Sequence, residues 1–373
     1  MLISSIQNFS CSFFRNYEHV SFKPESKFII ITGNNGIGKT NILEALSLFS
    51  PGRGLRNTKL EEMLNLNFSP LHPWKISGTI HGIDGESIMT TQFLPEIQEK
   101  KRHISINEIE IKKQQDLYNI CSISWVIPQM DGVFIQGSSS RRKFLDKLCS
   151  NFNNTYADTL NKYEYFIKER LALLKQDKPD QDWLTVVERK ASELAVIIAA
   201  IRVETCSIIQ NILEKLDYNL PKIRISVEGN LEKQIFSTPS LQLEQDFCNI
   251  LKKNRDFDAL SKRTNVGIHR SDLLVFNISK NINADMCSTG EQKLLLLAIF
   301  LAEVLAFIEV KGIIPILLLD DIMSYLDRER RYMLYEIIRD IGAQVWMTGT
   351  DEEHFDLITS GQIVKIQNNK IVI

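Results

Sequence analysis

Residues 33–40 read GNNGIGKT, which matches the G-x-x-x-x-G-K-[ST] pattern of a phosphate-binding loop. The backbone N–H groups of such a loop surround the phosphates of a nucleotide, and its glycines permit the tight backbone path. Lys39 is expected to reach the β- and γ-phosphates, and the Thr40 hydroxyl is expected to ligate Mg²⁺. The loop residues predicted to contact the nucleotide are Gly33, Asn34, Asn35, Gly36, Ile37, Gly38, Lys39 and Thr40.

The segments on both sides of this loop have the character that such a site requires. Residues 28–31 (FIII) form an apolar run typical of a buried strand, and the apolar residues from Ile42 to Phe49 have helical spacing. Strand, loop and helix therefore follow one another in the required order, and the sequence predicts a nucleotide-binding site.

A second part of this site is predicted near the C-terminus. Residues 313–319 are almost wholly apolar, as expected of a central parallel strand, and they end in Asp320 and Asp321. We assign Asp320 to Mg²⁺ and Asp321 to the base or water-orienting group of a catalytic reaction that also needs Lys39. Gln129 leaves another predicted strand, residues 122–127. It is either a catalytic residue that touches Mg²⁺ or the attacking water, or a plain loop residue.

Two further stretches are candidates for phosphate contacts. Arg53 and Arg56 follow the first helix, and they either fold back onto the nucleotide through bidentate contacts or are solvated. Residues 287–293 (CSTGEQK) open a long apolar helix whose expected N-cap is Ser288. Because a helix N-terminus binds anions, we assign Ser288, Gly290 and Gln292 to a γ-phosphate held by another subunit; plain helix capping is the alternative.

The composition is that of an ordinary soluble protein. The chain has 373 residues, of which 44% are hydrophobic and 24% charged, and its formal net charge is −2. Any DNA contact would therefore need local basic patches. Lys252, Lys253, Lys262 and Arg263 form either such a DNA-facing patch or a charged edge.

Cysteine usage and hydropathy bear on the compartment. The six cysteines are scattered without a C-x-x-C pair, which favours reduced thiols in a cytoplasmic protein over disulfides or a zinc site. The N-terminus lacks the pattern of a signal peptide. The apolar run 294–310 is interrupted by Glu303 and Glu309, so we expect a core helix rather than a membrane span.

The middle of the chain predicts a helical arm. One helix opens near Ser139 or Ser140, breaks at residues 151–154 and resumes to about residue 175, and a second runs from Trp183 to about Leu216. Apolar positions in the second helix alternate steps of three and four, which predicts a seam between two antiparallel helices. The seam residues are Leu184, Val187, Ala191, Leu194, Ile198, Ile201, Thr205, Ile208 and Ile212.

These motifs resemble, in their order, those of the ATP-binding-cassette ATPases of the SMC/Rad50 type, and within them the RecF family of bacterial repair proteins. The matching stretches are the phosphate loop and residues 52–56 (GRGLR), 141–146 (RRKFLD), 267–273 (GIHRSDL), 288–293, 317–321 and 324–327 (SYLD). The resemblance implies an α/β fold, in which an ABC-type ATPase head with a mixed sheet carries an inserted helical-hairpin domain. The expected divisions are 1–137 and 218–373 for the head and 138–217 for the arm.

The resemblance also implies a function in recombinational DNA repair and replication. It implies an ATP- and Mg²⁺-dependent homodimer that binds gapped duplex and single-stranded DNA and, with RecR and RecO, helps to load RecA. Gln129 stands where RecF proteins usually have Glu, and Ser138 and Ser139 replace a Gly/Ser-Pro step. No clear switch histidine follows residues 347–351, so hydrolysis is expected to be slow. The alternatives are the nucleotide-binding subunit of a membrane transporter and a nucleotide-gated scaffold that never hydrolyses ATP.

Overall fold

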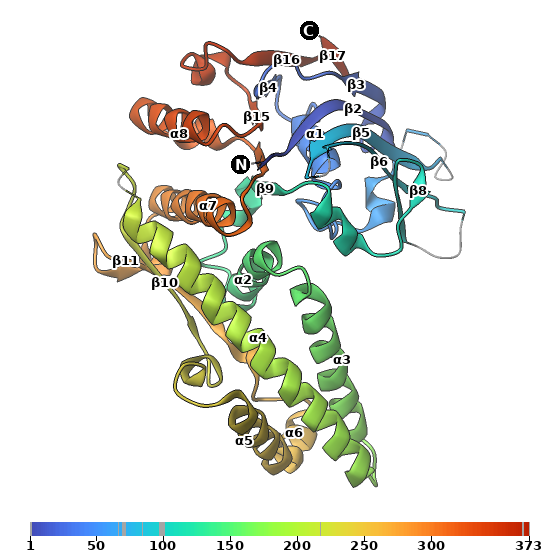
Figure 1. Ribbon diagram of the computed structural model, residues 1–373, viewed down its shortest axis with the longest axis vertical. Helices are drawn as coiled ribbons and strands as arrows, with labels where there is room; N and C mark the ends of the chain where they lie inside the picture. The colour runs from blue at the N-terminus through green and yellow to red at the C-terminus, as the bar shows by residue number, and fades with distance from the viewer. Residues whose placement is uncertain are drawn as a thin grey trace. The chain divides into compact units, whose positions relative to one another are not determined.

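The computed structural model describes residues 2–65, 67–68, 72–83, 85–96, 101–216, 218–367 and 369–372 (Figure 1). The chain forms two compact units. The first unites Met1–Asp131 with Val304–Ile373, and the second is Gly132–Glu303. Two segments far apart in the sequence therefore build the first unit together, and the second unit is inserted between them.

A largely parallel sheet of six strands forms one layer of the first unit, in the order β17-β16-β4-β15-β14-β9. Only β17 runs antiparallel to its neighbour, so the other strands end at the same edge of the sheet. The strands are β4 (Phe28–Thr32), β9 (Ile123–Val126), β14 (Ile316–Leu319), β15 (Val345–Gly349), β16 (Gln362–Gln367) and β17 (Lys370–Val372). The apolar run 28–31 lies in β4, and every residue of β4 and β14 is buried. Of the run 313–319, predicted to be one central strand, only residues 316–319 form β14, because Pro315 interrupts it and residues 313–314 pair in another sheet.

An antiparallel sheet of six strands forms the other layer, in the order β3-β2-β5-β6-β7-β8. Its strands are β2 (Ser5–Phe14), β3 (Tyr17–Phe22), β5 (Trp74–Gly82), β6 (Gly85–Phe93), β7 (Arg102–Ile106) and β8 (Ile109–Glu110). Alternating residues in 74–80 and 87–93, with glycines between them, predict a hairpin, and β5 and β6 form it, with Trp74 opposite Phe93. Alternation over residues 103–111 predicts a single strand. This prediction is wrong, because the chain turns at Asn107 and Glu108, both with positive φ, and forms the hairpin β7-β8.

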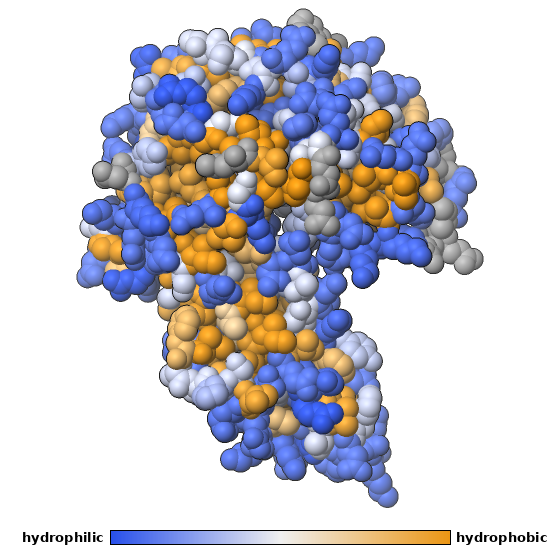
Figure 2. All heavy atoms as spheres, viewed as in Figure 1, coloured by the Kyte–Doolittle hydropathy of each residue, from blue (hydrophilic) through white to orange (hydrophobic). Residues whose placement is uncertain are grey.

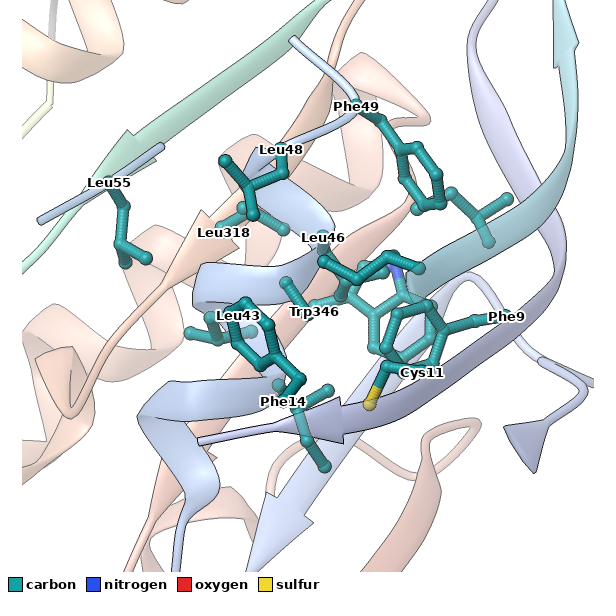
Figure 3. Packing of buried hydrophobic residues seen from close by; sticks show 14 of the residues in the cluster. Phe9, Cys11, Phe14, Leu43, Leu46, Leu48, Phe49, Leu55, Leu318 and Trp346 are labelled. Atoms are coloured by element: carbon teal, nitrogen blue, oxygen red, sulfur yellow. The ribbon is translucent and has the colours of Figure 1, made fainter. Parts of the chain in front are cut away.

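The helix after the phosphate loop, α1 (Lys39–Ser47), lies in the apolar core between these two sheets (Figure 3). Phe9 and Phe14 of β2 lie close to Leu43 and Leu46 of α1 in this view, and Trp346 of β15 closes the cluster. Trp346 packs edge-to-face on Phe9, with ring centroids 6.4 Å apart. This apolar packing fixes α1, and with it the loop that precedes the helix.

The first unit also holds a separate two-stranded sheet, in which β1 (Leu2–Ile3) and β13 (Ile313–Ile314) pair in parallel, and a helix, α8 (Arg328–Ile341), that precedes β15. The predicted core helix is α7 (Thr289–Lys311), within which the division between the two units falls. Its residues from Leu295 to Ala302 are almost completely buried, as expected.

The second unit consists of helices around a three-stranded antiparallel sheet. Its elements are α2 (Ser138–Phe152), α3 (Tyr156–Leu174), α4 (Gln181–Lys215), β10 (Ile223–Glu228), α5 (Ser240–Lys253), α6 (Arg255–Ser261), β11 (Asp272–Asn277) and β12 (Ile282–Asn283). The predicted break between α2 and α3 and the long helix α4 are present. Residues 218–303 belong to this unit, whereas the sequence prediction confined the insertion to residues 138–217.

Helix α4 shows why the seam prediction succeeded only in part. Asp180 caps the helix by accepting from the backbone N–H groups of Asp182 and Trp183. Of the predicted seam, Leu184, Val187, Ala191, Ile198, Thr205 and Ile212 are buried, and the others are half-buried. Apolar residues also lie over α4 on the face shown in Figure 2. The helix buries two charged side chains as well, Glu188 and Arg202, which heptad spacing does not predict.

Candidate nucleotide-binding site

The site lies at the edge where the parallel strands end. The phosphate loop follows β4, Gln129 follows β9, Asp320 follows β14, and Thr348 lies near the end of β15. Because these strands are parallel neighbours, their carboxyl ends bring together residues that lie up to three hundred positions apart in the chain.

The phosphate loop adopts a path that needs glycine. Gly38 has a φ of 111°, and a Cβ atom there would stand 2.5 Å from Nδ2 of Asn16 and 2.8 Å from the hydroxyl of Tyr17. Asn16 holds the loop in place, since its amide donates to the carbonyl of Ile37 (2.9 Å). The amide of Asn41 in turn donates to Oδ1 of Asn16 (2.8 Å). The loop shape is thus set by packing and hydrogen bonds from β2–β3 and α1.

Lys39 lies within the curve of this loop. Its Nζ donates to the carbonyl oxygens of Gly33 (2.7 Å) and Asn34 (3.0 Å), and the residue is only 9% exposed. Burial lowers the pKa of the Lys39 ammonium from its ordinary value, against the opposing effect of the Asp321 and Asp320 carboxylates. A phosphate anion at this position would compensate the buried charge.

Asp320 is held by two hydroxyl groups. Thr40 Oγ1 donates to its carboxylate (2.9 and 3.0 Å to the two oxygens), and Thr348 Oγ1 donates to Oδ1 (2.7 Å). Burial raises the pKa of the Asp320 carboxyl, and the hydrogen bonds from Thr348 and Thr40 partly offset this effect. A nearly buried carboxylate and a threonine hydroxyl, both hard oxygen donors, therefore stand side by side at the end of β14.

Asp321 occupies a left-handed backbone conformation, with a φ of 53°. Its N–H donates to Thr348 Oγ1 (2.9 Å), which fixes the backbone at this strained position. The carboxylate oxygen Oδ1 is buried and has no hydrogen-bond partner among the described residues. Strain and an unsatisfied oxygen at the edge of the site are features that structures commonly retain for function.

Arg56 is oriented by a buried acid that sequence reasoning missed. Glu44 of α1 is fully buried, and it accepts from Arg56 Nη1 (3.0 Å) and from Arg15 Nε (2.8 Å). Arg15 also donates to Glu44 Oε1 (2.6 Å), as does the Thr58 hydroxyl (2.9 Å). The signal in the sequence was an acid on the apolar side of a predicted core helix. Its partner Arg15 carries no local signal, because it lies 29 residues away.

An open cavity of about 320 Å³ unites these groups. It brings together the predicted residues Lys39, Thr40, Arg56, Gln129, Asp320 and Asp321, and Gly36, Gly38 and Asn35 of the loop also line it. Gln129 is exposed on the short helical turn Pro128–Met130. Arg53 does not join this group. It lines a different cavity of about 410 Å³ in the same unit, together with Lys59, Lys101 and Arg102.

The residues predicted to contact a nucleotide of another subunit belong to the second unit. The N–H of Ser288 donates to Glu291 Oε2 (2.9 Å) and the N–H of Glu291 donates to Ser288 Oγ (3.4 Å), a reciprocal cap at the start of α7. Gln292 is buried, and its amide donates to the carbonyl of Cys287 (3.0 Å). A Cβ on Gly290 would meet nothing within 4 Å, so this helix end is open above the glycine.

The basic residues are distributed over both units. Of the predicted DNA contacts, Lys252 and Lys253 end α5, and Lys262 and Arg263 follow α6, all of them exposed in the second unit. The cavity lined by Lys59, Lys101 and Arg102 is a second basic cluster, in the first unit. Sequence reasoning missed it because a turn of the chain near residue 59 and the start of β7 meet only in the fold.

Taken together, a strand, a glycine-rich loop and a helix, with a strand-end aspartate beside the loop threonine, define a phosphate-loop ATPase. The profile of the RecF/RecN/SMC N-terminal domain family matches residues 5–372. The chain is 37% identical over 358 residues to a DNA replication and repair protein RecF of Rickettsia felis, covering 95% of both chains. It is also 37% identical to the protein of that name from Rickettsia conorii, covering 95% of this chain and 96% of the other. The chain therefore belongs to the RecF family of DNA replication and repair proteins.

Solved structures give the same fold. A structure described as the recombination mediator protein RecF with an ATP analogue, in the RecFOR pathway, superposes with a TM-score of 0.86 at 23% identity, covering 99% of this chain and 98% of that one. An Smc head domain from Pyrococcus furiosus superposes with a TM-score of 0.55 at 15% identity, covering 99% and 96%. The predicted ATPase-head fold with a helical insertion is confirmed. Among the described residues, no helix is long and apolar enough to cross a membrane.

Proposed function

We propose that this protein is an ATP-dependent recombination mediator that binds DNA and acts with RecR and RecO. The observation that carries the proposal is the cavity in which Lys39, Thr40, Arg56, Asp320 and Asp321 meet around the phosphate loop. The relatives support it, because a structure of the same fold is described as RecF with ATP in the RecFOR pathway. The family match along almost the whole chain argues against the transporter alternative.

The donor set fits Mg²⁺ bound together with ATP. Thr40 and Asp320 offer oxygen ligands next to each other, and no cluster of three or more acidic, His or Cys side chains that could cage a metal exists among the described residues. Mg²⁺ suits such a site because it takes few protein ligands and completes its octahedron with phosphates and water. When bound, the ion would neutralise charge on the β- and γ-phosphates.

Asp321 is the group that we assign to the attacking water. Its Oδ1 has no hydrogen-bond partner among the described residues, and Asp321 lines the cavity together with Asp320, so this oxygen can accept a hydrogen bond from a water molecule without breaking another contact. Gln129 lines the same cavity and can orient that water through its amide. We expect slow hydrolysis, stimulated by DNA.

Ser288, Gly290 and Gln292 are assigned to the γ-phosphate of a second copy of the chain. The Ser288 hydroxyl accepts from the Glu291 N–H and also hydrogen-bonds to the Glu291 carboxylate, a bond that it would exchange for the phosphate. Gly290 leaves the helix N-terminus open to a phosphate, and Gln292 braces the turn through the carbonyl of Cys287. Two composite sites would then form only in an ATP-bound homodimer.

DNA binding is assigned to basic surfaces that dimerisation brings together. The net charge of −2 gives no general attraction to DNA, so local clusters must supply it. One candidate cluster in the first unit is Arg53, Lys59 and Lys101, which line one cavity with the buried Arg102 and a single acid, Glu61. DNA gaps and single-stranded DNA are the expected targets, and loading of RecA the expected outcome.

Sedimentation of the pure protein tests this function directly. We expect monomers without nucleotide, dimers with ATP and Mg²⁺, and a heavier complex when a gapped duplex is added. DNA binding should weaken steeply with salt, because phosphate contacts release counterions. A sedimentation profile that ignores ATP, together with DNA binding that ignores both ATP and salt, would remove the proposal. Replacing Lys59 and Lys101 by Glu should abolish the DNA complex and leave the dimer intact.

A further inference from the structure

Helix α6 of the second unit buries a charged side chain and exposes apolar ones. It spans Arg255–Ser261, and its charged residue Asp258 is completely buried. Two large apolar residues of the same short helix face outward: Phe257 is 57% exposed and Leu260 is 84% exposed. A helix that only needed to cover the core would place these residues the other way round.

An ion network holds α6 in this orientation. Arg170 of α3 is completely buried, and it donates to Asp258 Oδ2 (2.7 Å) and to Glu188 Oε1 of α4 (2.9 Å). Arg255 also donates to Glu188 (2.6 Å), and the backbone N–H of Asn265 donates to Asp258 Oδ1 (3.0 Å). The network joins α3, α4 and α6, which lie together in Figure 1. Turning α6 over would leave these buried charges without partners, at a large cost in free energy.

Exposed cations lie at both ends of this apolar face. Lys252 and Lys253 precede the first turn of α6, and Lys262 and Arg263 follow its last turn. All four are exposed, and none forms an ion pair within the part of the chain that the structure describes. Asp256 is the one exposed acid on the helix itself. Since α6 is about 10 Å long, the four charges and the two apolar side chains share one small surface.

We propose that this α6 surface (Lys252, Lys253, Phe257, Leu260, Lys262 and Arg263) docks an acidic polypeptide segment that carries apolar side chains. The charge complementarity selects an acidic partner, and the two apolar side chains supply the anchor that a protein interface requires. DNA would contact the cations through its phosphates and would stack on Phe257, but an aliphatic side chain such as Leu260 would contribute nothing to DNA binding. The surface is distinct from the nucleotide site, and the inference does not rest on ATP binding.

The test uses a fluorescein-labelled acidic amphipathic peptide of roughly three helical turns, with Leu and Phe on one face and Asp and Glu on the other. Its binding to the full chain is measured by anisotropy. A peptide with the apolar residues replaced by Ala, and a single-stranded DNA oligonucleotide, serve as parallel probes. The apolar variant is Phe257→Ala with Leu260→Ala, and the charge variant is Lys252→Glu, Lys253→Glu, Lys262→Glu and Arg263→Glu.

Matched controls lie elsewhere on the same unit. Phe236→Ala removes an apolar side chain that is 82% exposed beyond the opposite end of α5, and Lys222→Glu reverses an exposed charge just before β10. Because Phe257 and Leu260 are exposed, the apolar variant should unfold like the wild type. Leu260→Ser serves as a second, smaller change should the double variant be unstable.

We expect the apolar and the charge variant each to weaken peptide binding about tenfold or more, while both controls bind like the wild type. The Ala-substituted peptide should bind weakly, and the apolar variant should bind DNA as the wild type does. The inference is overturned if the acidic peptide fails to bind at about 1 mM. It is also overturned if the apolar variants bind the peptide normally while the charge variant loses DNA, which would make the surface a DNA contact.

Discussion

Lys39 satisfies its ammonium group within its own loop, through the carbonyl oxygens of Gly33 and Asn34. The same group is the one expected to bind the β- and γ-phosphates of ATP. We predict that Lys39→Ala weakens ATP binding about 100-fold, since a charge-assisted contact contributes up to ~3 kcal/mol. Isothermal titration measures the effect, and Lys23→Ala, which removes an exposed lysine after β3, is the control. An unchanged affinity would contradict the assignment.

Substitution of Asp321 should distinguish ATP binding from ATP hydrolysis. Asp321→Asn keeps Thr40 and Asp320 in place, so ATP and Mg²⁺ should still bind, but the group that orients or deprotonates water is lost. We predict a drop in turnover of at least about 100-fold, the range of a general base. Single-turnover assays on nucleotide-loaded protein measure it, and titration with ATP confirms that affinity is retained. Normal turnover would move the role to Gln129.

For individual residues, the sequence predicts those that belong to motifs, but it does not predict the side chains that hold the motif residues in place. Lys39, Thr40, Asp320 and Asp321 follow from local patterns, and they line one cavity in the structure. Thr348, Glu44 and Arg15 hold Asp320 and Arg56 in place, but they come from other strands and helices. Tertiary packing determines which residues these side chains contact, and the spacing of residues along the chain does not predict such contacts.

Among the elements, we expect the contact between α3 and the turn Ile268–Arg270 to depend on pH. His269 lies between the hydroxyl of Tyr163 and the carbonyl of Thr264, each 2.9 Å from a ring nitrogen. Burial lowers the pKa of His269, and the charges of Arg270 and Arg142 lower it further. The folded state therefore favours the neutral ring, whereas the unfolded chain takes up a proton near pH 6.5.

The sign of the effect follows from that difference. Below about pH 6.5 the unfolded state binds more protons, so the stability of the second unit should fall as the pH drops, until the folded pKa is passed. Trp183 is the only tryptophan of this unit, and its fluorescence in urea titrations reports its unfolding. We predict a lower midpoint at pH 5.5 than at pH 7.5, and a smaller difference in His269→Gln. An equal difference in both proteins would assign the effect to other groups.

The prediction of the arm shows where periodicity stops being informative. Spacing in α4 predicts a long helix with an apolar seam, and that helix is present. The partners that cover it are α5 and β10 as well as α3, so the unit continues beyond residue 217. Glu188 and Arg202 lie on the buried side, where their charges are matched by Arg170, Arg255 and Asp146. Buried ion pairs of this kind leave no periodic signature.

For the whole molecule, the composite site makes a prediction about mixtures. Lys39→Ala removes the ammonium group of the phosphate loop. Ser288→Arg places a bulky side chain where the partner subunit would dock. Each variant should be inactive alone. In a mixed dimer, one site pairs intact Lys39 from one chain with intact Ser288 from the other. We predict that mixing restores part of the ATP hydrolysis, at most about half, because one of two sites is intact.

This experiment needs one control measurement and one milder variant. Sedimentation must show that the mixed dimer forms despite its doubly damaged second interface. Ser288→Ala, a small change at the same position, serves as a milder partner if it does not. Should Ser288→Arg hydrolyse ATP at the normal rate as a monomer, the shared site is wrong, and Ser288 only caps α7.

The order of strands in the parallel sheet has a consequence for folding of the chain during translation. Among the described strands, β4, which precedes the phosphate loop, pairs with β15 and β16 alone, and β9 pairs with β14 alone. No strand of this sheet therefore finds a partner until the chain has been translated past residue 316. The antiparallel sheet, by contrast, is complete by residue 110. A chain that ends before residue 316 lacks the strand pairs that position the phosphate loop, so we expect ATP binding only after translation has passed these strands.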